Sequence, residues 1–136
     1  MHKYTVVVRE TLLDSFGHVN NARYLELFEE ARWDLITAHG YDLGKIQSTR
    51  IGPVILGVTL KFKKELLPRT EIVIETQMND YRGKIGTLSQ VMRLPDDTIA
   101  CEAVFTLAVM DLDKRKIIPP PEEWLNALQT KAVDER

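Results

Sequence analysis

Long stretches rich in β-branched residues, separated by very short connections, constrain this chain more than any other feature. Three of the connections are LPR, RG and PDD, which are typical of turns. Connections this short join neighbouring antiparallel strands, so an antiparallel sheet is expected. The predicted strands are Lys3 to Leu12, Val54 to Leu66, Thr70 to Tyr81, Lys84 to Leu94 and Thr98 to Asp113.

One segment between the first and second strands has a helical period instead. Its apolar residues recur at steps of three and four, which places them on one face of a helix. Asn20 or Asn21 is suited to cap the start, and Gly40 is suited to end it, so the helix covers about 18 residues or about 27 Å. The expected apolar face consists of Tyr24, Leu27, Phe28, Ala31, Leu35 and Ala38.

Together these elements predict an α+β fold in which a five-stranded antiparallel sheet wraps around one long central helix. A chain of 136 residues has the size of one domain, so residues 1–136 are expected to form a single domain. The segment PPPEEWLNALQ predicts a short helix begun by prolines near the C-terminus. Trp124 and Leu128 are its expected packing residues.

The composition argues against several classes of binding partner. The formal net charge of -2 gives no general attraction to nucleic acid or to an anionic membrane. The longest apolar stretch, IGPVILGVTL, is about half of what a membrane helix needs, and the N-terminal segment is charged, so a cytoplasmic protein is expected. Cys101 is the single cysteine, and His2 and His39 lack the spacing of metal ligands. We therefore expect neither a metal nor a cofactor.

The segment DSFGHVNNARYLELFEEAR, from Asp14 to Arg32, resembles the signature of the hotdog-fold thioesterases of the 4-hydroxybenzoyl-CoA thioesterase type. That pattern is an Asp, a Gly three positions later, a short polar run, a Tyr and a Glu-x-Ala-Arg ending. Together with GKIGTLSQV, the segment is most similar to the bacterial long-chain acyl-CoA thioesterases. The resemblance implies a hotdog fold, the same architecture that the strand and helix patterns predict, and hydrolysis of a fatty acyl-CoA.

The resemblance also implies roles for residues of this motif. Asp14 matches the nucleophile or general base, and the backbone N–H of Asn21 matches the group that polarises the thioester carbonyl. Gly17 and Tyr24 of the motif are expected to bind substrate, and Gly17 fits a turn that needs a positive φ or a close backbone approach. His18 would orient Asp14 or the attacking water.

Structural explanations exist for the same residues. Asp14 would serve an Asx-turn ahead of the helix, and His18 would satisfy backbone groups of that turn. Glu29 and Arg32, three residues apart, are expected to form a structural pair on the helix. Cys101 lies in an apolar strand and is expected to act as a small hydrophobic residue.

Coenzyme A carries phosphates, which call for basic groups at the mouth of the site. Related thioesterases use basic residues in the stretch that matches DYRGKIG, so Arg82 and Lys84 are candidates, and LKFKKE adds Lys61. The acyl group is expected to lie against Phe28, Ile55 and Leu56. The exposed edge of such a sheet and the resemblance both point to a homo-oligomer, a dimer or a dimer of dimers with sites at the dimer seam.

Two other functions are compatible with this sequence. Hotdog dehydratases and hydratases act on 3-hydroxyacyl or enoyl thioesters with a His and an acid, and His18 with Asp14 resembles such a pair. A non-catalytic acyl-CoA binding module is the other alternative. Its mark would be the loss of the Asp or of the helix-start pattern, and both are present.

Overall fold

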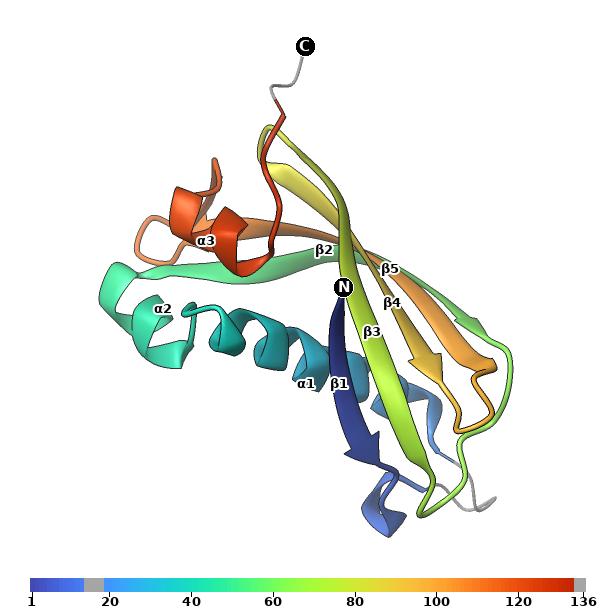
Figure 1. The fold of residues 1–136 in the computed structure, drawn as a ribbon. Helices are drawn as coiled ribbons and strands as arrows, with labels where there is room; N and C mark the ends of the chain where they lie inside the picture. The colour runs from blue at the N-terminus through green and yellow to red at the C-terminus, as the bar shows by residue number, and fades with distance from the viewer. Residues whose placement is uncertain (14–18, 134–136) are drawn as a thin grey trace.

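A computed structural model describes residues 1–13 and 19–133 of the protein (Figure 1). The predicted long helix and all five predicted strands are present, with ends that differ by a few residues. In chain order the elements are β1 (His2–Val7), a short 3-10 helix (Glu10–Leu12), α1 (Asn21–Ala38), α2 (Leu43–Thr49), β2 (Ile51–Phe62), β3 (Glu71–Arg82), β4 (Ile85–Arg93), β5 (Ile99–Asp111), β6 (Lys116–Ile118) and α3 (Glu122–Ala127).

The strands form one sheet in the order β1-β3-β4-β5-β2, and every neighbouring pair is antiparallel. β1 and β2 are therefore its two edges. The prediction of five strands misses β6, which pairs with the end of β5. The pairing of β4 with β5 ends at Gly86 opposite Leu107. β6 pairs with the residues of β5 that follow this point. Its three residues are too few to give a sequence pattern.

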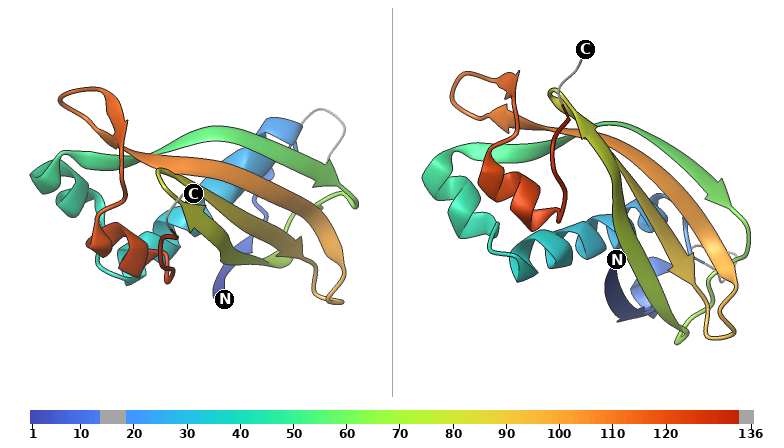
Figure 2. Two further views of the ribbon diagram at one scale, coloured as in Figure 1. Left: turned by 90° about the horizontal axis from the view of Figure 1, so that it is seen from above. Right: turned by 45° about the horizontal axis from the view of Figure 1, so that its top comes forward.

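α1 crosses the inner, concave face of this sheet (Figures 1 and 2). It has the predicted 18 residues, and five of the six residues of the predicted apolar face are buried. The sixth, Ala38, is exposed, and Ile36 is buried in its place. The change follows from α3, which packs beside the last turns of α1, so that the buried face of α1 turns toward α3 there. Gly40, with a φ of 90°, ends the helix as predicted.

The first predicted strand is too long at its C-terminal end. β1 stops at Val7, because its neighbour β3 begins opposite it at Glu71. The chain then turns through the 3-10 helix, of which only Leu12 is buried. The helix α2 is also absent from the prediction, although Asp42 marks its start by accepting the Lys45 N–H at 2.8 Å.

The C-terminal helix confirms its prediction. α3 starts directly after Pro121, and Trp124 and Leu128 are buried. The ring of Trp124 meets that of Tyr41 edge to face, with 5.2 Å between centroids. α3 thus closes the end of the core at which α1 ends.

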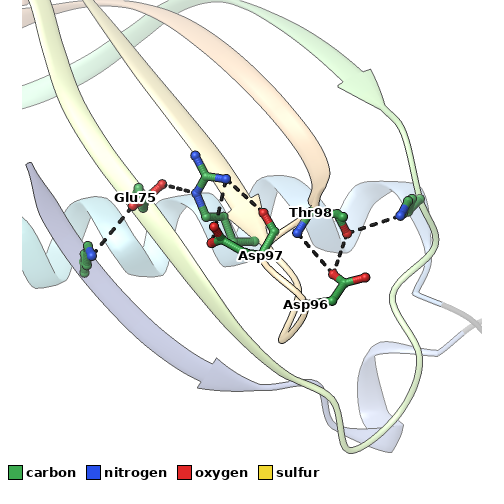
Figure 3. A network of polar contacts seen from close by, with 7 residues as sticks. Glu75, Asp96, Asp97 and Thr98 are labelled. Carbon is green, nitrogen blue, oxygen red and sulfur yellow. Dashed lines mark hydrogen bonds and ion pairs between the residues drawn. The ribbon is translucent and has the colours of Figure 1, made fainter.

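The outer face of the sheet carries a network of charges (Figure 3). Glu75 on β3 lies between two basic residues, with Lys3 Nζ of β1 at 4.0 Å and Arg93 Nε of β4 bound to its other oxygen. Arg93 also donates to the carbonyl of Asp97 at 3.0 Å. These contacts tie β1, β3 and the β4–β5 hairpin together.

In the part of the chain that the structure describes, no helix combines the length and the apolarity needed to cross a membrane.

Candidate active site

The start of α1 is held between two other parts of the chain. The Val19 N–H donates to the Leu66 carbonyl at 3.2 Å, in the connection between β2 and β3. The Asn20 N–H donates to the Leu12 carbonyl at 3.1 Å, and Leu13 forms an antiparallel bridge with Val19. The residues on both sides of the segment 14–18 therefore meet at the first turn of α1.

Three predicted site residues belong to that segment. Asp14, Gly17 and His18 lie outside the described residues, and their roles stay predictions. What the structure supplies is the framework to which this segment is joined.

The first turn of α1 offers backbone donors. Asn20 is the cap, with extended backbone angles, and its side chain accepts the Ala22 N–H at 2.9 Å. Asn21 is the first residue of the helix and is exposed. The first N–H groups of a helix have no acceptor within the helix and lie at the positive end of its dipole. Such groups can stabilise an oxygen that gains negative charge.

Tyr24 lies in the core, one turn further along α1. Its ring meets that of Phe62 edge to face, with 5.0 Å between centroids. Burial is the largest cause that raises the pKa of Tyr24, and the backbone of Leu66 opposes it with a hydrogen bond. Leu66 is also the residue whose carbonyl accepts the Val19 N–H at the helix start.

A cavity of about 270 Å³ lies between the second half of α1, the inner face of the sheet and α3. Its walls are mostly apolar. Of the three residues predicted to contact the acyl group, Ile55 lines this cavity, whereas Phe28 is buried in the core and Leu56 lies outside the lining. The other apolar residues of the wall are Trp33, Leu35, Ile36, Pro53, Leu88, Leu107, Trp124 and Leu128.

Arg32 is the basic residue of this cavity. Its Nη1 donates to the Gln90 Oε1 at 3.0 Å, and its Cζ lies 4.2 Å from the centre of the Phe105 ring. The fully buried Gln90 donates in turn to the Thr76 hydroxyl at 2.9 Å and to the Phe28 carbonyl at 3.1 Å. This polar network ties the middle of α1 to β3 and β4.

The predicted Glu29–Arg32 pair is wrong as a direct contact. Among the described residues, no carboxylate lies within 4.0 Å of Arg32, because its guanidinium turns toward Gln90 on the sheet. Burial lowers the pKa of Arg32 to about 10, with Glu29 opposing that shift from a greater distance. Arg32 is therefore cationic at neutral pH.

The three predicted phosphate contacts lie at two ends of the sheet. Arg82 and Lys84 belong to the β3–β4 hairpin, and Arg82 donates to Asp80 at 2.9 Å. β3 separates this hairpin from the end at which α1 starts by about 36 Å, at about 3.3 Å per residue (Figure 1). Lys61 is exposed and precedes Phe62, which contacts Tyr24. Within one chain, only Lys61 of the three lies near the helix start.

A comparison with protein families decides the class of the protein. The thioesterase-like superfamily matches residues 8–128. The chain belongs to this superfamily. The prediction of a thioester hydrolase is thereby confirmed.

Individual relatives of this thioesterase agree with that assignment. The chain is 32% identical over 114 residues to the long-chain acyl-CoA thioesterase FadM of Escherichia coli (strain K12), covering 83% of this chain and 86% of that protein. The crystal structure of YbaW, a probable thioesterase from Escherichia coli, has a TM-score of 0.82 at 30% identity, with 95% of this chain and 97% of that chain covered. These neighbours confirm the hotdog fold.

More distant structures share the fold. SAV2348 from Staphylococcus aureus, solved in complex with CoA, has a TM-score of 0.87 at 18% identity, covering 94% of this thioesterase and 81% of that chain.

The sequence did not predict the contact between Arg32 and Gln90. Both belong to stretches that the sequence assigns correctly, Arg32 to α1 and Gln90 to β4. Arg32 follows Ala31 of the apolar face, a position from which a long side chain can reach back to the sheet. The residues two positions before and two positions after Gln90 are apolar and buried. A polar residue at such a position of a strand must find hydrogen-bond partners, and this was the available signal.

Proposed function

We propose that this thioesterase hydrolyses medium- to long-chain fatty acyl-CoA to a free acid and CoA. Asp14 acts as the nucleophile or as the general base for water, and the Asn21 backbone N–H polarises the thioester carbonyl. The acyl-CoA thioesterase FadM, at 32% identity, supports the substrate class. A cytoplasmic location and a part in fatty-acid metabolism belong to the same proposal.

The observation that carries this proposal is the framework around the helix start. Asp14 is covalently attached to Leu13, which pairs with Val19 two residues before Asn21. A carboxylate on that short connection can reach a thioester whose carbonyl oxygen meets the first turn of α1. Removing one such oxyanion donor commonly raises the barrier by about 3 kcal/mol, so the helix start is as necessary as the acid.

Release of free thiol tests this proposal. Purified protein and the Asp14→Asn variant are given short, long-chain and aromatic acyl-CoAs. We expect the wild type to favour a medium or long chain, and we expect the variant to lose about 99% of its turnover or more while it still unfolds at the wild-type temperature.

A matched control separates catalysis from helix capping. Asp42 also precedes a helix and accepts the Lys45 N–H at 2.8 Å, so Asp42→Asn makes the same chemical change at a capping aspartate. It is expected to retain turnover. Equal activity of Asp14→Asn and wild type would refute the mechanism. Dehydration with an intact thioester would favour the dehydratase alternative, and binding without any reaction would favour the binding module.

We further propose that the working form is a homodimer, or a dimer of dimers, joined through β2. β2 has 12 residues and forms one edge of the sheet. Val58 lies opposite Phe105 and Phe62 opposite Cys101, so both belong to the inner face, yet both are exposed. Antiparallel pairing of two β2 edges would satisfy their open backbone groups and cover these side chains.

Such a dimer would also give Arg82 and Lys84 a role. Antiparallel pairing brings opposite ends of two protomers together. The β3–β4 hairpin of one protomer then lies toward the start of α1 in the other protomer, near Lys61 of that second protomer. In this arrangement the CoA phosphates would be bound by basic residues of two chains.

A further inference from the structure

The cavity beside α3 combines an apolar wall with one cation that has spare hydrogen-bond donors. A guanidinium carries five N–H groups, and only the bond from Arg32 to Gln90 is formed among the described residues. Arg32 is partly buried, so its remaining donors are partly removed from water. The nearby Phe105 ring offers its face to the cation but takes no conventional hydrogen bond.

An unsubstituted alkyl chain is a poor occupant for this space. It would displace water from Arg32 and leave the guanidinium donors without acceptors, which costs free energy. Sites built to bind an oxygen discriminate strongly against the analogue that lacks it, for the same reason. The arrangement therefore favours an occupant that is mostly apolar and carries an acceptor oxygen.

The place of Arg32 on α1 sets where that oxygen lies. Arg32 follows Asn21 by eleven residues, which is about 16 Å along the helix axis. A thioester held at Asn21 would bring only the far part of a long acyl chain to Arg32. The wall here is formed by Ile36 of α1, Pro53 of β2 and Trp124 of α3.

We propose that this cavity binds the far end of the acyl group and that Arg32 selects chains carrying an oxygen there, as a hydroxyl or a carboxylate. This inference rests on the proposed acyl-CoA hydrolysis and narrows its substrate class. Arg32 is a specificity residue, and it takes no part in the reaction at the thioester. Exposed Glu29 at the same cavity disfavours a second negative charge, so the hydroxyl is the preferred form.

Three acyl-CoAs of equal chain length test the inference: unsubstituted, with a terminal hydroxyl, and with a terminal carboxylate. For the wild type we expect kcat/KM to be at least about tenfold higher with the hydroxyl than with the unsubstituted chain. In Arg32→Met this ratio should fall to about one, mainly by a loss for the hydroxylated ester. Arg23→Met makes the same change on an exposed arginine of α1 that pairs with Glu26, and it should keep the wild-type ratio.

Each outcome decides the inference separately from the proposed function. A wild-type ratio of one or less for both oxygenated esters overturns it, even if Arg32→Met does not fold. An unchanged ratio in folded Arg32→Met overturns the role of Arg32. In both cases, hydrolysis of the unsubstituted ester would leave the proposed function standing, whereas no hydrolysis of any ester would refute that function. A preference for the carboxylate over the hydroxyl would support the role of Arg32 and correct the role of Glu29.

Discussion

β1 and β2 are both edge strands, but they end the sheet in different ways. β1 has six residues; its inner residues Tyr4 and Val6 pack against the core, and Lys3 on its outer side joins the charged network around Glu75. β2 has 12 residues, and Val58 and Phe62 of its inner face are exposed, although the ring of Phe62 also contacts Tyr24 of α1. The comparison supports the proposal that β2, and not β1, is the edge that pairs with a second copy of the chain.

A lysine placed on each edge tests this difference most strongly. Val58→Lys puts a charge on the inner face of β2, where a partner would bury it, and should weaken dimerisation by about 3 kcal/mol or more. The dimer Kd would then rise more than about a hundredfold, and turnover would fall with the dimer. Thr5→Lys on β1 should change neither. Molar mass from light scattering, followed by thiol release, measures both effects. A monomeric wild type, or a dimer that survives Val58→Lys, would refute the β2 interface.

Alanine substitutions at two glycines, one on β2 and one in the interior, should differ in their effect on the stability of the protein. This effect is smaller than that of the lysine substitutions. A Cβ added at Gly86 on β4 would lie 2.7 Å from the Tyr81 ring, so Gly86→Ala should destabilise the protein by about 1–3 kcal/mol. At Gly57 on β2 an added Cβ meets nothing within 4 Å, and Gly57→Ala should be nearly neutral in the monomer. Urea unfolding compares the two variants. Equal destabilisation would mean that Gly57 is covered in solution, which would locate the partner more closely.

The smallest effect is expected for the reaction of the Cys101 thiol with a disulfide reagent. Cys101 lies opposite Phe62 of β2, and burial raises the pKa of its thiol to about 11. At pH 8 about one thiol in a thousand would be ionised, so a disulfide reagent should not react with the folded protein. Full reaction should appear in denaturant. Rapid reaction of the native protein would show that β2 separates from β5.

Most of the fold follows from the sequence because its signals are local. The helical period and the caps at Asn20 and Gly40 predict α1, and alternating residues between short turns predict the four long strands. The strand order is not local, since β2 pairs with β5 and not with β3, its neighbour in the chain. The cap Asp42 was a readable signal for α2, whereas three-residue β6 offers none.

The site is less accessible to such reasoning, because it depends on distant contacts. The motif that carries the family resemblance does place Asn21 at the first residue of α1. Arg32 belongs to the same motif, but its contacts are Gln90 on β4 and Phe105 on β5, which no spacing along the helix predicts. The distance of Arg82 and Lys84 from the helix start likewise depends on the whole length of β3.

The central claim, that the start of α1 is the reactive centre, is tested most directly by deleting one backbone N–H. Proline is tolerated as the first residue of a helix, and Asn20 already has the extended backbone that precedes a proline, with φ of -62° and ψ of 140°. Asn21→Pro should therefore fold normally and lose the donor, whereas Asn21→Ala keeps it. We predict a fall in kcat/KM of about a hundredfold or more for Asn21→Pro alone. Similar activity in the two variants, both folded, would contradict the claim.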